Sequence, residues 1–386
     1  MPFDVSLFGV KVRGYRDQFK MDIPDLSRRS GIPERDLRDL EESRRRPTGD
    51  EVLILADCFL LSDFRFLISD ETTAPYEQTK KLFRAFDHEL GREDRWAIQE
   101  FLYLCECEEE LEQLTGMARR RVQPFEFEPR GTYRIGHGKQ GARALRQHLG
   151  LEPRMVSTDI FAYIRSLGIH CFRRSLQNSA ISGMFIRHPT AGKCILVNYQ
   201  EDVYRQRFTA GHELAHAIFD SEHDFVVSFH NSKKWPMDKL VEIRANTFSS
   251  RFLMPPESLA LLPKTRWDER KVHHWCHQFR VNRTALLIAL RDAGIITEHT
   301  YDKLKAGVRA VPQAQKPDPE IGTDLSPAQR TRKLELLRRG LTHSYVSLGL
   351  DAHDQEQISL GRLAEVLMVP EREIGDLAAL YGRQIQ

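Results

Sequence analysis

Two histidines of this 386-residue chain have the spacing of metal ligands. They belong to the sequence His212-Glu213-Leu214-Ala215-His216, which on a helix places both imidazoles on one face, one turn apart. Both rings can then reach one tetrahedral metal ion. Glu213 lies beside them and can act as a general base toward a water molecule on that metal. The motif therefore predicts metal-assisted hydrolysis.

A third protein ligand is needed to complete such a site. One known arrangement would place glycine at position 219 and histidine at position 222, but this chain has Phe219 and Glu222 there. The alternative is a glutamate from a following helix. Glu242 lies 26 residues after His216, and Asn246 follows one helical turn later. We expect Glu242 to supply the third ligand and Asn246 to accept the outer N–H of a ligating histidine, which leaves the fourth position for water.

Other histidines and cysteines give weaker signals. His223 or His230 could stabilise an oxyanion, although a histidine in a loop is more often a surface residue. The remaining clusters lack a completing ligand and are interpreted as packing or surface residues: His273, His274, His277, Cys105 and Cys107.

The segments that carry the motif predict a mixed α+β region. One helix is expected from about residue 202 to 220 and the next from about 238 to 253, where Pro255 and Pro256 end it. They are preceded by helical patterns at 139–149 and 158–167. Three strand-like runs follow these patterns, at 169–173, 184–188 and 194–198. An extended substrate could add to an edge of this sheet beside the metal.

Three segments together resemble the IrrE/ImmA-type metallopeptidases, gluzincin-like enzymes of bacteria and phages. They are RQRFTAGHELAHAIFD (205–220), EIRANTFSSRFLMP (242–255) and the preceding strands SGMFI and CILVN, so the resemblance covers roughly residues 135–300. It implies site-specific cleavage of a protein, often a repressor of the helix-turn-helix type.

The same resemblance implies roles for individual residues. It assigns one zinc ion to His212, His216 and Glu242, with Glu213 as the catalytic base. The chain departs from the family pattern at two positions, where Arg244 replaces an acid and Ser249 replaces an alanine. Neither position is a metal ligand or the catalytic base.

The amino-terminal segment predicts a helix-turn-helix. Residues 11–66 contain short helical patterns with tight turns, and Gly31 lies at the turn between two of them. The apolar spacing of this unit is carried by Leu26, Ile32, Leu37 and Leu40. Over 25–61 the sequence resembles the XRE-type repressor family, in which the second helix enters the major groove of DNA.

Charge leaves the role of this segment open. The second helix, expected at 33–42, has five acids on or just after it and two arginines, and residues 1–66 contain twelve basic and thirteen acidic side chains. Acids facing the phosphates oppose binding to DNA. DNA binding and protein docking therefore stay as alternatives, and the arginines that could contact phosphate are Arg28, Arg29, Arg35, Arg38, Arg44, Arg45 and Arg46.

The rest of the chain predicts helices and linkers. An acidic cluster at 106–112 is interpreted as a solvated helix face, and linkers are expected at 119–138 and 306–326. In the last helical segment VPEREIGDL echoes IPERDLRDL of the first. We interpret this echo as the core spacing of small three-helix units, without shared function.

Composition favours a cytoplasmic protein without a membrane partner. Hydrophobic residues make up 41% and charged residues 29%, and no stretch approaches the length of a membrane span. The amino terminus lacks a basic leader before an apolar stretch, and the six cysteines contain no CxxC pair. The net charge of +2 gives no global case for nucleic acid.

We therefore expect a multi-domain, mainly α protein with a central α+β zincin-like peptidase domain. The expected parts are a helix-turn-helix at 1–70, a helical connector at 71–118, the peptidase domain at 135–305 and a helical domain at 327–386. The expected function is zinc-dependent cleavage of a specific partner, such as a repressor or a co-encoded toxin or antitoxin. The alternative is a non-catalytic DNA-binding regulator or antitoxin-like protein that uses the peptidase fold as a binding scaffold.

Overall fold

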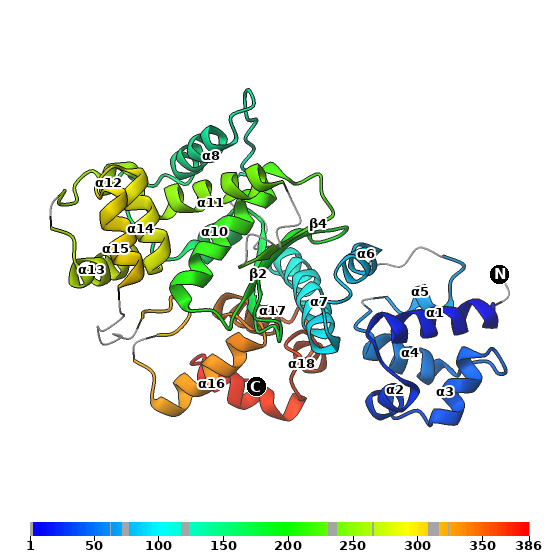
Figure 1. Ribbon diagram of the computed structural model, residues 1–386. Helices are drawn as coiled ribbons and strands as arrows, with labels where there is room; N and C mark the ends of the chain where they lie inside the picture. Colours follow the sequence, from blue (N-terminus) through cyan, green and yellow to red (C-terminus); the bar gives the residue numbers. More distant parts are fainter. Residues whose placement is uncertain are drawn as a thin grey trace. The chain divides into compact units, whose positions relative to one another are not determined.

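The computed structural model describes residues 3–61, 63–71, 77–116, 123–230, 238–264, 266–307, 316–322 and 324–385 (Figure 1). The chain divides into two compact units, Met1–Glu106 with Leu176–Asn178 and Cys107–Ser175 with Ser179–Gln386. No helix within these described ranges combines the length and the apolar character that crossing a bilayer requires. The four predicted domains stay a prediction.

The first unit is built from short helices. Its second helix begins at a capping box, in which Asp22 and Asp25 bond each other's backbone N–H, and ends at Gly31, whose φ of 73° favours glycine. The elements are α1 (Val5–Gln18), α2 (Ile23–Ser30), α3 (Glu34–Glu41), α4 (Gly49–Cys58), α5 (Arg65–Ile68), α6 (Glu77–Ala85) and the first part of α7 (Arg92–Thr115).

The predicted apolar spacing of this unit is a packing pattern. Leu26, Leu37 and Leu40 are fully buried, and Ile32 is nearly so, where α2, the turn and α3 meet. The structure thus shows two short helices joined by a tight turn. Membership of the XRE-type family stays a prediction.

The second unit contains a four-stranded mixed sheet in the order β1-β3-β2-β4. Its strands are β1 (His170–Arg174), β2 (Ile181–His188), β3 (Gly192–Asn198) and β4 (Phe225–Phe229). β1 is parallel to β3, whereas β2 is antiparallel to both β3 and β4. The three predicted strands are confirmed, and β4 is an additional strand at the sheet edge. The expectation of a mainly helical protein with an α+β part is confirmed as well.

Helices surround this sheet. α10 lies against β2 and β3, and α11 packs beside α10, with α8 on its other side (Figure 1). The helices are α8 (Arg134–His148), α9 (Ile160–Ser166), α10 (Val203–Phe219), α11 (Lys239–Leu253), α12 (Pro256–Leu259), α13 (Glu269–Phe279), α14 (Arg283–Asp292), α15 (Glu298–Ala306), α16 (Pro327–Arg338), α17 (His343–Asp354), α18 (Leu360–Val366), the 3-10 turn η3 (Glu371–Glu373) and α19 (Ile374–Leu380).

A buried arginine fixes α10 in this layer. Arg207 is fully buried and donates to the carbonyl oxygens of Ser157, Thr158 and Arg280 at 2.5, 2.6 and 3.0 Å. Burial lowers its pKa to about 10, which still leaves the guanidinium charged at neutral pH. Three carbonyls from two loops are thus satisfied by one side chain of α10.

The acidic cluster on α7 is not a solvated face throughout, so that interpretation was wrong for Glu108. The Glu108 side chain is buried and accepts a hydrogen bond from His170 Nδ1 at 2.7 Å, and Glu109 lies 3.3 Å from the other ring nitrogen. Burial opposes protonation of His170, but the hydrogen bonds to Glu108 and Glu109 outweigh it and raise its pKa to about 10. This ion pair links α7 to β1.

The ion pair predicts a loss of stability at alkaline pH. Because the pKa of folded His170 lies above its ordinary value, its contribution is complete below about pH 6.5 and disappears as the pH rises toward 10. We expect the free energy of unfolding to fall by roughly 3–4 kcal/mol between pH 7 and pH 10 from this group. Urea unfolding at several pH values measures it. His170→Gln should flatten this slope and the exposed control His299→Gln should not; equal slopes in all three proteins would contradict the assignment.

Two predicted linkers are only partly described. Residues 117–122 and 308–315 lie outside the described residues. α8 begins at Arg134, inside the first predicted linker. Residues 316–322 of the second are not a free linker, because Asp318 binds the buried Arg173 through two contacts of 2.8 and 2.9 Å and Glu320 pairs with Arg165.

The carboxy-terminal echo has a structural counterpart. Leu363, Val369, Ile374 and Leu377 are buried at the junction of α18 and α19, as their counterparts are at the junction of α2 and α3. Met368, with φ 50°, takes the left-handed place of the turn glycine. The echo is thus a shared core spacing, in agreement with its interpretation as packing.

Candidate metal centre and active site

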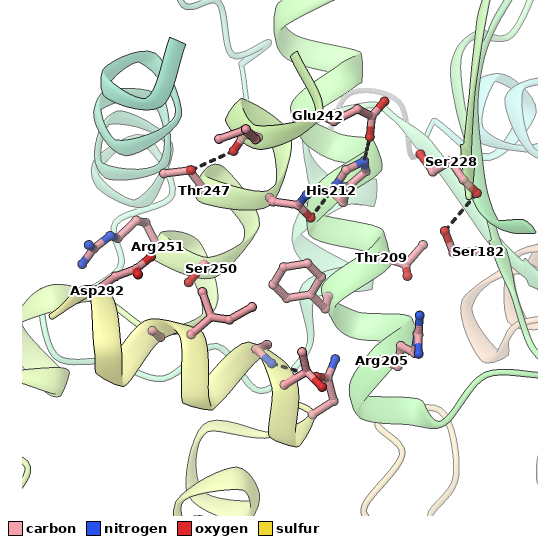
Figure 2. A pocket seen from close by; sticks show the side chains of 18 of the residues that line it. Ser182, Arg205, Thr209, His212, Ser228, Glu242, Thr247, Ser250, Arg251 and Asp292 are labelled. Carbon is pink, nitrogen blue, oxygen red and sulfur yellow. Dashed lines mark hydrogen bonds and ion pairs between the residues drawn. The ribbon is translucent and has the colours of Figure 1, made fainter. Parts of the chain in front are cut away.

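Three possible metal ligands converge between α10 and α11. His212 Nε2 lies 3.1 Å from His216 Nε2 and 3.2 Å from Glu242 Oε2, and His216 Nε2 lies 3.9 Å from Glu242 Oε1. All three side chains are buried. Among the described residues this is the group of three whose ligand atoms come close enough to hold one ion. Figure 2 shows Glu242 directed toward His212.

The outer nitrogen of each imidazole is held by an oxygen. His212 Nδ1 donates to Asn246 Oδ1 at 3.2 Å, and His216 Nδ1 donates to Asp220 Oδ2 at 2.9 Å. The other carboxylate oxygen of Asp220 accepts from the buried Arg244. These contacts fix the tautomer and direction of both rings, so that both Nε2 lone pairs face the same point.

The donor set fits a zinc ion. Two imidazole lone pairs at 3.1 Å repel each other unless a cation lies between them, and both oxygens of buried Glu242 have no hydrogen-bond partner in the described residues. A tetrahedral zinc with bonds of about 2.0–2.1 Å would separate two ligand atoms by about 3.3 Å. The observed separations of 3.1, 3.2 and 3.9 Å lie around that value.

Glu213 lies beside this group, on the side of the sheet. Its side chain is fully buried, and within the described part of the chain neither carboxylate oxygen has a hydrogen-bond partner. Gly183 of β2 makes this placement possible, since a Cβ there would lie 3.1 Å from Glu213 Oε1 and 2.7 Å from Thr209 Cγ2. Burial raises the pKa of Glu213 to about 8. A nearby bound cation would lower it again toward the neutral range that suits a general acid or base.

A cleft of about 800 Å³ opens beside the three ligands (Figure 2). β4 and α10 form one wall, α8 and α11 the opposite wall, and α14 the remaining side. His212 and Glu242 reach its surface, as does Asn246. The cleft is therefore the space through which a substrate would reach the metal.

The two histidines considered for the oxyanion lie in different surroundings. His223 is half exposed after α10, and its Nε2 is 3.7 Å from Glu222. His230 lines the cleft, but its Nδ1 accepts from Arg205 at 2.6 Å and its Nε2 lies 2.7 Å from Glu201. Both ring nitrogens of His230 are thus engaged, and neither offers an N–H to a substrate in this arrangement.

The weaker clusters do not form metal sites in the described part of the chain. His277 Nδ1 lies 2.9 Å from the hydroxyl of Tyr204, and its ring packs beside that of His273. Cys105 and Cys107 are buried thiols.

Most of the amino-terminal arginines already have acidic partners. Arg28 pairs with Asp25, Arg38 with Glu34, Arg44 with Asp39 and Glu42, and Arg45 with Glu51. Arg29 lies over the Trp96 ring and donates to the Cys58 carbonyl. Arg35 and Arg46 are exposed.

Sequence reasoning missed Asp220, Arg244 and Ser249 as parts of the site. Asp220 had a local signal, because it follows His216 by four residues and ends the quoted motif. Arg244 and Ser249 had none, since their roles depend on contacts between two helices. Ser249 Oγ donates to the Phe208 carbonyl at 2.7 Å and so joins α11 to α10.

The oxygens that hold the imidazoles give a testable prediction. We expect Asn246→Ala and Asp220→Ala each to weaken zinc binding about ten- to hundredfold, because each frees one ring while leaving three ligands. Competition with a chelator of known affinity measures this. Asp302→Ala, at an exposed position of α15, serves as control; unchanged affinity in both site variants would show that the rings are held by other contacts.

Comparison with known proteins agrees with this geometry. Residues 164–291 match the family model of the IrrE N-terminal-like peptidase domain, which confirms the resemblance to IrrE/ImmA-type metallopeptidases over that segment. The match spans the four strands and the two ligand-bearing helices, and it covers neither α1–α7 nor the helices after α14. No curated protein matches the chain.

Proposed function

We propose that this protein is a zinc-dependent endopeptidase that cleaves one specific regulatory or partner protein. This proposal is supported mainly by the close approach of His212, His216 and Glu242, with Glu213 buried beside them. All four residues lie inside a segment that matches a peptidase domain. A repressor of the helix-turn-helix type, or a co-encoded toxin or antitoxin, is the class of substrate that we infer.

The chain's residues have separate tasks in this reaction. His212, His216 and Glu242 would hold the ion, and Asn246 and Asp220 would keep the rings aligned. Zinc, when bound, supplies Lewis acidity that lowers the pKa of water and polarises a peptide carbonyl. Glu213 takes the proton of the attacking water and returns it to the leaving amine.

The sheet edge supplies a place for the substrate backbone. β4 is one of the two edge strands of the described sheet, and Ser228, Phe229 and His230 line the cleft. An extended segment that pairs with this edge would pass the metal ligands with its backbone aligned.

A cleavage assay tests the proposal. The metal-loaded full chain is incubated with the products of its neighbouring genes, and fragments are identified by mass spectrometry. We expect one cleavage site in one partner, loss of cleavage after zinc is chelated, and recovery when zinc is restored. Partner binding without cleavage by the zinc-loaded protein would favour the alternative of a non-catalytic scaffold, which zinc content alone does not distinguish.

We further infer that the amino-terminal unit docks a protein rather than DNA. Most of the arginines available for phosphate are neutralised by neighbouring acids, and residues 1–66 are net negative. Few counterions would therefore be released from a duplex. A basic surface on the partner protein is the complementary target.

This inference predicts weak DNA binding. We expect the full chain to bind random duplex DNA no tighter than about 10⁻⁴ M at physiological salt, the weak end of non-specific binding. Fluorescence anisotropy over a range of salt concentrations measures it. Tight, steeply salt-dependent binding to a specific duplex, lost in Arg35→Ala, would restore a role in DNA recognition.

A further inference from the structure

The sheet is irregular where it meets the wall of the cleft. Ile181 of β2 pairs with Phe229 of β4. Two residues further along β2, Gly183 pairs with Ser228, so Ser182 is the extra residue of a β-bulge. The Ser182 hydroxyl donates to the Ser228 carbonyl at 3.0 Å and satisfies the backbone at this point. Bulges of this kind often lie beside active sites, where they redirect a side chain.

The bulge places the Ser228 side chain beside Glu213. Residues that pair directly in an antiparallel sheet direct their side chains to the same face, with Cβ atoms about 4.5–5.5 Å apart. A Cβ on Gly183, the partner of Ser228, would lie 3.1 Å from Glu213 Oε1. Ser228 therefore faces α10 at the position of Glu213, and Figure 2 shows its hydroxyl directed from β4 toward that helix.

Both groups are buried and unpaired. The Ser228 hydroxyl and the two carboxylate oxygens of Glu213 are closed to solvent and have no hydrogen-bond partner among the described residues. Buried polar groups that stay unpaired cost free energy, so native structures rarely leave them so. A serine hydroxyl can rotate to donate, and an ionised carboxylate accepts only. The two groups are thus complementary in chemistry as well as neighbours in space.

The other hydroxyls on this wall of the cleft already donate elsewhere. Thr209, one helical turn before Glu213, donates to Glu201 Oε2 at 3.0 Å, and the Ser182 hydroxyl is bonded to the Ser228 carbonyl. The electrostatics of Glu213 agree with a nearby hydroxyl. Burial raises the pKa of Glu213, whereas the charge of His212 and the Ser228 hydroxyl oppose that rise, and a neutral hydroxyl has this effect only at close range.

We propose that the Ser228 hydroxyl donates a hydrogen bond to the Glu213 carboxylate and is a positioning residue for this general base. The proposal rests on the proposed peptidase function, because it assigns a task within that reaction. One carboxylate oxygen would be held by β4, which leaves the other oxygen to take the proton of the attacking water. A base that is held in one orientation needs no rearrangement before it reacts.

Steady-state kinetics of the zinc-loaded full chain with its physiological partner test this role. We expect Ser228→Ala to lower kcat at least about tenfold and to change KM less than about twofold, because it removes a hydrogen bond to a charged group and leaves the rest of the cleft intact. Ser347→Ala makes the same change on α17, outside the cleft, and should leave both constants unchanged. Unchanged kcat in Ser228→Ala would overturn the proposal.

A double variant shows whether Ser228 acts through Glu213. In the Glu213→Gln background, which retains only residual cleavage, adding Ser228→Ala should lower kcat less than about twofold, since the base that the hydroxyl positions is already absent. Multiplicative effects of the two substitutions would overturn the proposal. Zinc content and thermal stability are measured on every variant, and a loss of kcat in Ser228→Ala that is accompanied by loss of zinc would also overturn it, because it would mean a structural role.

A crystal structure of the zinc-loaded full chain gives a readout that does not depend on activity. We expect Ser228 Oγ within about 2.5–3.0 Å of a Glu213 oxygen, and a changed direction of that carboxylate in Ser228→Ala. A Ser228 hydroxyl that is bonded only to another group, or a carboxylate that keeps its direction in the variant, would overturn the proposal even if the partner is cleaved. Absence of cleavage with the contact present would count against the peptidase function and would still support the hydrogen bond.

Discussion

Replacing Glu213 by glutamine is expected to reduce proteolysis at least about a hundredfold while the metal stays bound. The amide has nearly the volume of the carboxylate, so it fits the buried space beside Gly183. It has no basic oxygen that could take a proton from water, and general-base catalysis typically contributes about 10²–10⁴ in rate. Metal analysis by mass spectrometry, run beside the cleavage assay on the physiological partner, measures both parts of the expectation.

A matched control tests whether the effect is local. Glu222→Gln makes the same chemical change at an exposed residue three positions beyond the end of α10. Cleavage by this variant should be unchanged, and zinc should be retained by both proteins. Undiminished cleavage by Glu213→Gln would remove Glu213 from the mechanism. Loss of zinc from that variant would mean that Glu213 supports the metal site instead of acting as its base.

The part of the site that follows from helical spacing could be predicted from the sequence. His212 and His216 lie four residues apart on α10, and Glu242 and Asn246 lie four apart on α11. Each pair falls on one helix face because an α-helix repeats every 3.6 residues. The juxtaposition of the two pairs is a tertiary contact, which spacing alone suggests but does not determine.

The features that were missed depend on contacts between elements. β4 has only five residues, and its strand conformation is stabilised by pairing with β2. Glu108 has the sequence surroundings of a solvated acid, and its burial is favoured by the hydrogen bond from His170 on β1. Arg244 departs from the family pattern, yet it supports Asp220 from the neighbouring helix. Such pairings have no periodic signature in a single sequence.

Replacing Glu242 by alanine is expected to remove most of the zinc, with affinity lowered more than the ten- to hundredfold expected for Asn246→Ala. The variant leaves two imidazoles, and two protein ligands hold zinc far less well than three. The substitution should leave the fold intact, because Glu242 lies in the first turn of α11 and its oxygens have no hydrogen-bond partner in the described residues. Circular dichroism checks this, and zinc is quantified after dialysis against a weak chelator.

A comparison of two variants of α11, Glu242→Ala in its first turn and Asn246→Ala in its second, makes this test specific for the third metal ligand. Asn246→Ala changes the same helix and removes a contact to His212, but it keeps all three ligands. Partial zinc retention by that variant and near-complete loss from Glu242→Ala would assign the third ligand to Glu242. Stoichiometric zinc in the Glu242 variant would place that ligand elsewhere. His223 would be the next residue to replace, although its half-exposed ring beside Glu222 would then have to move toward His216.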